Sequence, residues 1–127
     1  MKKEMKENNQ AMKQFEVLGQ PLPKPRMARG TKWYYNKTYW NYLNSASEIV
    51  WAEMKKNKWK GTDLDVSLSC WFYRKGKKRA DLDNMVKTIL EICQKVGLVK
   101  NDSQITYLKE IGVSYEAKEP KTIFEVW

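Results

Sequence analysis

The strongest constraint on the fold of this chain is the alternating stretch at residues 64–73. Apolar residues occupy every second position there, which predicts a strand with one buried face. Amphipathic stretches with three- and four-residue spacing flank it at 37–58 and 82–96, and they predict two long helices. Short apolar runs predict further strands at 15–18, 105–115 and 122–127. We therefore expect an α+β domain in the order β-α-β-α-β-β, with a mixed sheet of about four strands and two main helices.

The chain has 127 residues, a length that suits one domain with its own core. Residues 1–14 are polar and rich in charge, and we expect a flexible N-terminal extension ahead of a domain spanning 15–127. That extension lacks the apolar stretch of a signal peptide, and no apolar run has the length of a membrane-spanning helix. These features favour a cytoplasmic protein without a membrane partner.

The formal net charge of +9 indicates an anionic partner. Nucleic acid fits best, because a phosphate backbone releases counterions when clustered lysine and arginine side chains bind it. The candidate DNA contacts come from a proline-rich loop and a basic loop, and they are Lys24, Arg26, Arg29, Arg74, Lys75, Lys77, Lys78 and Arg79. A charge run of this kind is also a common solvated surface, so both interpretations stay open. Aromatic residues between lysines at 32–37 could stack on bases or pack against the first helix.

The chain contains no histidine, which excludes histidine-based acid–base catalysis and every histidine-containing metal site. Its two cysteines, Cys70 and Cys93, lie in apolar stretches and have no CxxC spacing. We expect both to be small buried apolar side chains. Any catalytic chemistry must therefore come from carboxylates, lysines, hydroxyls or these two thiols.

Two aspartates stand where the basic loop meets the second predicted helix. Asp81 and Asp83 are followed by Asn84, and Lys87 lies four residues after Asp83, on the same helix face. Carboxylate oxygens are the ligands that Mg²⁺ prefers, so the pair could hold this ion without help from histidine. One of the aspartates could instead cap the helix, and Lys87 could form a surface ion pair rather than contact a phosphate.

A third aspartate, Asp102, lies in a polar turn between the second helix and the strand at 105–115. Alone it is typical of an ordinary turn. It would join a metal site only if the fold brings it beside Asp81 and Asp83, and the spacing along the chain does not decide this.

The stretch Arg79–Gln104 resembles the signature of the RusA family of Holliday junction resolvases. The signature contains an Asp-x-Asp-Asn motif, a lysine four residues after the second aspartate, an apolar helix and an aspartate-containing turn before glutamine. Residues 15–29 also resemble the N-terminal strand and basic loop of the family. The family turn often carries two acidic residues, whereas the first position here is Asn101, so metal affinity is expected to be lower.

The resemblance implies a Mg²⁺-dependent endonuclease that resolves four-way DNA junctions by paired symmetric nicks, with Mn²⁺ able to substitute. It implies metal ligation by Asp81, Asp83 and Asp102, with Lys87 assisting catalysis, and no partner besides branched DNA and a second copy of the chain. A phage or prophage origin would be a natural setting. A homodimer matches a two-fold junction, and the apolar end of the last strand, 123–127, is one candidate interface.

Three other functions remain open at this point. A DNA-binding module without catalysis explains the charge, but it leaves the aspartates as unfavourable charges beside a phosphate-binding loop. A nuclease of the same chemistry could act on flaps or forks. A small-molecule phosphohydrolase is disfavoured by the charge and by the absence of a glycine-rich phosphate loop.

Overall fold

The computed structural model describes residues 13–25 and 36–127, and it confirms the expected order of elements. The elements are β1 (Lys13–Leu18), α2 (Lys37–Lys56), β2 (Val66–Tyr73), α3 (Leu82–Lys95), the 3-10 helix η2 (Asp102–Gln104), β3 (Ile105–Ser114) and β4 (Lys121–Val126). β1 begins at Lys13, so the domain starts within the stretch expected to be an extension. The expected flexibility of residues 1–12, and the contacts expected of Arg26 and Arg29, lie outside the described residues.

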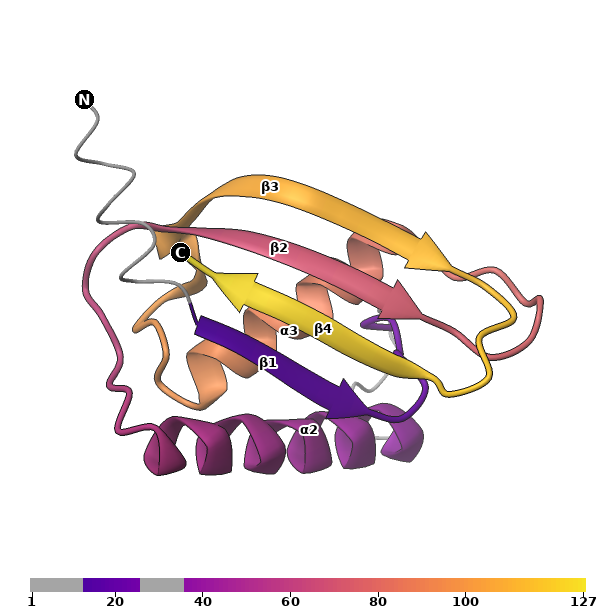
Figure 1. Cartoon of the computed structure of the whole chain (residues 1–127), viewed down its shortest axis with the longest axis horizontal. Helices are drawn as coiled ribbons and strands as arrows, with labels where there is room; N and C mark the ends of the chain where they lie inside the picture. Colours follow the sequence, from indigo (N-terminus) through magenta and orange to yellow (C-terminus); the bar gives the residue numbers. More distant parts are fainter. Residues whose placement is uncertain (1–12, 26–35) are drawn as a thin grey trace, which may run out of the picture.

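The four strands form one mixed sheet in the order β1-β4-β2-β3 (Figure 1). β2 and β3 are parallel neighbours connected through α3, whereas β4 is antiparallel to both β1 and β2. A parallel pair needs a long crossover connection, and α3 supplies it. The carboxyl ends of β2 and β3 therefore lie at the same edge of the sheet, where α3 begins.

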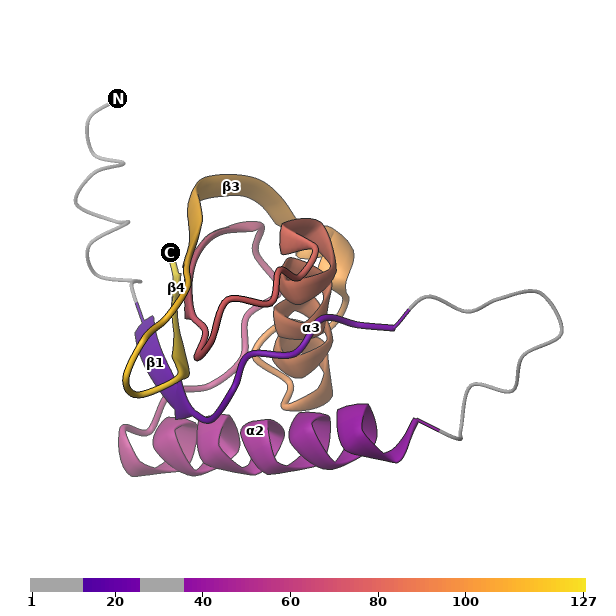
Figure 2. The ribbon, with the colours of Figure 1, turned by 90° about the vertical axis from the view of Figure 1, so that its right-hand side faces the viewer.

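α3 lies against one face of the sheet, and α2 crosses below it beside β1 (Figure 2). The side chain of Asn36 caps α2 by accepting a 3.0 Å hydrogen bond from the backbone N–H of Tyr39. α3 ends as expected just before Gly97, which has a φ of 80° and is followed by a 2.9 Å bond from Leu98 N–H to the Cys93 carbonyl. Both helices therefore begin and end where the sequence signals predict.

The core lies between the sheet and the two helices. The alternation predicted for β2 is confirmed, because Val66, Leu68, Cys70 and Phe72 are all buried. Leu64 lies outside the strand and is 73% exposed, so the alternating pattern begins later than the sequence suggests. Both cysteines are buried as expected, and burial raises the pKa of the Cys93 thiol to about 12. A protonated, buried thiol is a poor nucleophile, so the cysteines are structural.

Close backbone packing fixes the connection between α2 and β2. A Cβ added at Gly61 would lie 1.9 Å from the carbonyl oxygen of Gly97. The next residue, Thr62, forms an isolated parallel bridge with Val99. Only glycine allows the two backbone segments to approach this closely, and their contact holds the end of α3 against the domain. No helix in the described part of the chain is long and apolar enough to cross a membrane.

Candidate active site and DNA interface

The two aspartates of the predicted site lie at the start of α3. Asp81 occupies the N-cap position, but its side chain makes no capping hydrogen bond, and Asp83 lies in the first turn. The Asp81 carboxylate instead accepts a 3.2 Å hydrogen bond from the side-chain amide of Asn84. Helix capping therefore does not account for Asp81. The positive end of the helix dipole favours both carboxylates here.

Buried contacts fix Asn84 in turn. Asn84 is only 7% exposed, and its backbone carbonyl oxygen accepts a 2.9 Å hydrogen bond from the backbone N–H of Lys24. The Thr88 hydroxyl donates a 2.9 Å bond to the carbonyl of Leu22, which anchors the same proline-rich segment. These bonds hold the first turn of α3 and the 20–25 segment together. The hydrogen bond from Asn84 therefore holds the Asp81 carboxylate against a part of the backbone that is itself fixed.

Tyr115 fixes the residue immediately before the aspartates, a contact that the sequence did not predict. Its hydroxyl accepts a 3.2 Å hydrogen bond from the backbone N–H of Ala80 and lies 3.4 Å from the Ala80 carbonyl oxygen. The guanidinium of Arg79 lies 4.8 Å from the centre of the Tyr115 ring. Nothing in the sequence marks this tyrosine, because the contact depends on β3 ending beside the start of α3.

Lys87 is exposed one turn beyond Asp83. Among the residues that the structure describes, it forms no ion pair with Asp83, which removes the simplest structural explanation for the spacing. A lysine in this position is available to an anion that approaches the start of α3.

The third aspartate lies at the opposite end of α3. Asp102 is exposed in η2, and its backbone N–H donates a 3.0 Å hydrogen bond to the side chain of Gln94, in the last turn of α3. A helix of 14 residues is about 21 Å long, so one chain does not bring Asp102 beside Asp81 and Asp83. Consistent with this, the described residues contain no group of three acidic or cysteine side chains that could hold a metal ion.

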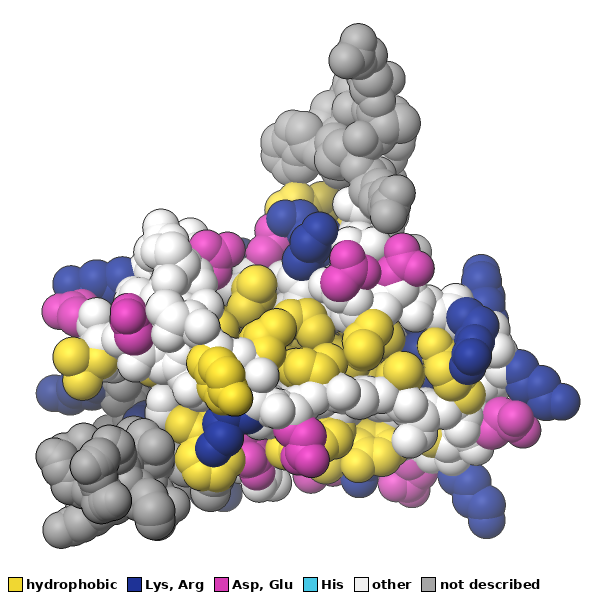
Figure 3. Space-filling model, turned by 90° about the horizontal axis from the view of Figure 1, so that it is seen from above, with side chains coloured by type: hydrophobic (Ala, Val, Ile, Leu, Met, Phe, Trp, Pro, Cys, Tyr) yellow, Lys and Arg dark blue, Asp and Glu magenta, His cyan; other side chains and the backbone are white. Residues whose placement is uncertain are grey.

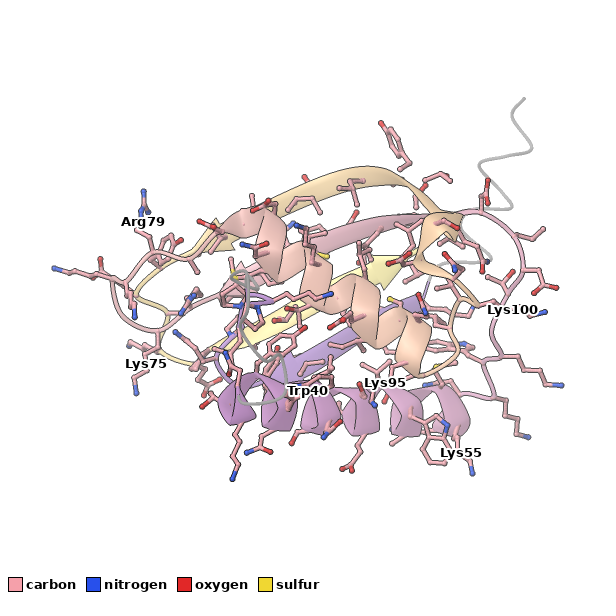
Figure 4. The ribbon with its side chains drawn as sticks, turned by 180° about the vertical axis from the view of Figure 1, so that it is seen from behind. Trp40, Lys55, Lys75, Arg79, Lys95 and Lys100 are labelled. Atoms are coloured by element: carbon pink, nitrogen blue, oxygen red, sulfur yellow. The ribbon has the colours of Figure 1, made fainter. Side chains whose placement is uncertain are left out.

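Figure 4 makes the separation visible, because Lys75 and Arg79 lie at one end of the molecule and Lys100 at the other. A capping box fixes the Asp102 turn: Asn101 accepts a 2.9 Å bond from Ser103 N–H, and Gln104 accepts one of 3.0 Å from Asn101 N–H. The same Gln104 side chain donates to the carbonyl of Leu64 at 2.9 Å. Asn101, where the family often has an acid, therefore has a structural role as a cap.

The basic loop after β2 is exposed beside the aspartates, except at its first residue. Lys75, Lys77, Lys78 and Arg79 are exposed, whereas Arg74 is only 7% exposed. Arg74 continues the inward positions of β2, and its Nε and Nη1 groups have no hydrogen-bond partner among the described residues. The predicted DNA surface in this loop therefore consists of the four exposed cations. The Lys24 ammonium lies elsewhere, 2.9 Å from Glu91.

A small α+β domain with two carboxylates next to an exposed basic loop suits an enzyme that acts on nucleic acid. Comparison with known proteins agrees: the family described as Endodeoxyribonuclease RusA matches residues 14–126. The crossover junction endodeoxyribonuclease RusA of Aquifex aeolicus (strain VF5) is 23% identical over 110 residues, covering 85% of this chain and 87% of that protein. The chain belongs to the RusA family of endodeoxyribonucleases.

Proposed function

We propose that the protein is a Mg²⁺-dependent endonuclease that resolves four-way DNA junctions by paired nicks, acting as a homodimer. Each metal site would combine Asp81 and Asp83 of one chain with Asp102 of the other. The observation that carries the proposal is the placement of these carboxylates at opposite ends of α3. The name of the Aquifex aeolicus relative, a crossover junction endodeoxyribonuclease, supports the choice of substrate.

A two-fold axis beside the middle of α3 and β3 would complete both sites at once. If the axis is perpendicular to α3, it reverses the direction of this helix, so Asp102 of each copy approaches the helix start of the other. The carboxylates are hard oxygen donors, which suits Mg²⁺, with Mn²⁺ as a substitute. The dimer would then carry two sites related by the two-fold axis, which matches a pair of symmetric nicks in a four-way junction.

The edge strand β3 offers an apolar surface for this contact. Figure 3, seen from the β3 side of the molecule, shows a band of hydrophobic side chains along its middle. On β3 itself, Tyr107 is 62% and Leu108 is 49% exposed. The interface considered from sequence, residues 123–127, is unsuitable in part, because Phe124 and Val126 are buried in the core of their own chain. We therefore place the dimer contact on β3 and α3.

The residues of the chain then have distinct tasks. A bound divalent ion would offset negative charge on the scissile phosphate and would activate a water molecule for attack. Asn84 and Tyr115 orient the Asp81 segment, and Lys87 would contact a phosphate oxygen and offset its developing charge. The exposed cations of the basic loop would bind the DNA backbone without reading sequence, and their binding would weaken with salt.

The first test is cleavage of a labelled synthetic four-way junction beside a linear duplex of the same sequence, with and without Mg²⁺. We expect symmetric nicks in the junction alone, only with the metal, and none with Asp83→Asn protein. Tight junction binding without cutting under any divalent ion would reject the enzyme and favour a binding module. Cutting of flaps or forks at an equal rate would reject junction specificity.

Mixing inactive variants tests the composite site. A dimer of one Asp83→Asn chain and one Asp102→Asn chain keeps one intact site, because that site takes Asp81 and Asp83 from one chain and Asp102 from the other. Coexpression should therefore restore nicking to about a quarter of the wild-type rate per chain. The matched control is Asp81→Asn with Asp83→Asn, which damages both sites and should restore nothing. Equal results for the two mixtures would contradict the shared site.

A further inference from the structure

Four exposed lysines lie close together at the end of α2. They are Lys55, Lys56, Lys58 and Lys60. Figure 4 shows Lys55 at the opposite end of the molecule from Lys75 and Arg79 of the basic loop. None of the four forms an ion pair with a residue that the structure describes, and the nearby Glu53 carboxylate accepts a 2.9 Å hydrogen bond from the side chain of Asn57 instead. The end of α2 is therefore a second concentration of unpaired positive charge.

Lys58 occupies a position that usually belongs to glycine. Its φ is 59°, its N–H donates a 3.1 Å hydrogen bond to the Lys55 carbonyl, and Trp59 N–H donates one of 2.8 Å to the Met54 carbonyl. These two bonds form a Schellman motif, in which glycine is the commonest residue at this place, because a Cβ there approaches a neighbouring carbonyl oxygen and costs stability. The helix dipole favours lysines in the last turn of α2, but it does not require one at a strained position beyond the helix. Stability therefore does not account for Lys58, and residues held in such conformations cluster at functional sites.

The backbone that carries these lysines is fixed, and it contacts the Asp102 turn. The Trp59 ring packs edge-on against the buried Phe15 ring, with the ring centroids 5.5 Å apart. Two residues after the last lysine, the carbonyl of Thr62 accepts a 2.8 Å hydrogen bond from the side chain of Gln104. Gln104 belongs to η2 together with Asp102, so the lysine segment is joined to the third predicted metal ligand. A backbone that is already ordered loses little entropy when it binds a ligand.

We propose that the four lysines bind DNA phosphates on the side of the cleavage site that lies opposite the basic loop. The proposal rests on the proposed function, whose dimer brings Asp102 of one chain to Asp81 and Asp83 of the other. The lysines next to the Asp102 turn then lie on one side of the metal site, and the basic loop of the other chain lies on the other side. The DNA crosses from one basic surface to the other, with the scissile phosphate between them. Phosphate contacts of this kind position the DNA without reading its sequence.

The experiment measures junction binding by full-length Asp83→Asn protein, which should bind without cutting, in gel shifts over a range of salt concentrations. Adding Lys58→Gly removes one charge and also relieves the backbone strain. We expect Tm to rise by about 2–5 °C, while the junction affinity falls about 3- to 10-fold at about 0.1 M salt. The slope of log affinity against log salt concentration should fall by about one phosphate contact. A lysine kept for stability would lower Tm when replaced and leave binding unchanged.

Lys60→Gln tests the charge without altering the end of the helix, and it should weaken junction binding to the same extent. Lys37→Gln is the matched control, because it removes one exposed charge from the first turn of the same helix, about 30 Å from Lys56. It should change the affinity less than about twofold. Unchanged affinity in either Lys58→Gly or Lys60→Gln, or an equal loss in Lys37→Gln, would overturn the proposed lysine surface.

Cleavage of the junction by the wild-type protein, measured in parallel, separates this proposal from the proposed function. Junction cutting together with normal binding by the lysine variants rejects only the lysine surface. Binding that depends on the lysines, without cutting under any divalent ion, supports the lysine surface and rejects only the nuclease.

Discussion

The two ends of α3 are held by different contacts, and only the far end adds close backbone packing to its side-chain hydrogen bonds. At its start, side-chain hydrogen bonds fix the Asp81 segment: Asn84 donates to Asp81, and the Tyr115 hydroxyl bonds to Ala80. At its other end, the backbones of Gly61 and Gly97 pack closely together, and the side chains of a capping box fix the Asp102 turn. Both ends present an aspartate on a fixed backbone, which is the condition for metal ligands that must keep their geometry.

Neither end of α3 alone carries all three of the predicted metal ligands. The start of α3 has two of the predicted metal ligands and the exposed basic loop, while the other end has one aspartate. The predicted metal ligands are thus divided between regions about 21 Å apart. The proposed dimer would bring the two regions together, and each end can be tested separately.

The largest expected effect is the loss of junction cleavage when an aspartate at either end of α3 is replaced. Asp83→Asn and Asp102→Asn should each lower junction cleavage about 10³-fold or more, since each removes a charged ligand from the same proposed metal site. Junction binding should stay equal or tighten, because each change removes repulsion against phosphate. Single-turnover cleavage and gel-shift titrations measure the two properties. A defect at one end only would show that the ends do not serve one site.

Gly61→Ala should be the most destabilising change at the far end of α3. Its new methyl group would meet the Gly97 carbonyl oxygen at 1.9 Å, so the backbone must shift, at a cost of about 1–3 kcal/mol. Thermal or urea denaturation gives the change in the free energy of unfolding. Gly112→Ala is the control for an added methyl group, because a Cβ there meets nothing within 4 Å. Equal losses at both sites would argue against the close contact as the cause.

Tyr115→Phe tests the start of α3 with a smaller change. Removing the hydroxyl deletes both contacts to Ala80, and we expect about 1 kcal/mol lower stability. A role in positioning the aspartates predicts, in addition, a higher Mg²⁺ concentration for half-maximal cleavage, with junction affinity unchanged. Tyr73→Phe is the control, because the Tyr73 hydroxyl makes no hydrogen bond with any described residue. A stability loss without any shift in metal dependence would limit Tyr115 to a structural role.

The smallest expected effect concerns Asn101. Asn101→Asp keeps a side-chain oxygen for the bond from Ser103 N–H and adds a charge next to Asp102. The Mg²⁺ requirement should fall about 3- to 10-fold, with little change in stability. A metal titration of the cleavage rate measures this. An unchanged requirement would separate position 101 from the metal site.

Much of the local structure was predictable from sequence. The expected strands and helices are present with small differences at their ends, because the period of apolar residues reports which face of each element is buried. Gly97 ended α3 where expected, and the cysteines were buried. Arg74 was assigned to a basic loop, but strand alternation continues through it, and following that alternation from Phe72 would have predicted its burial.

The sequence by itself determined the order of elements, the paired aspartates at the start of α3 and the basic loop before them, since each depends on residues that are neighbours along the chain. Only the tertiary structure decided where Asp102 lies and that Tyr115 contacts Ala80. Those positions follow from the length of α3 and from the parallel pairing of β2 with β3, which relate residues far apart in sequence. Spacing along a chain does not give distance in space once a helix and a strand intervene.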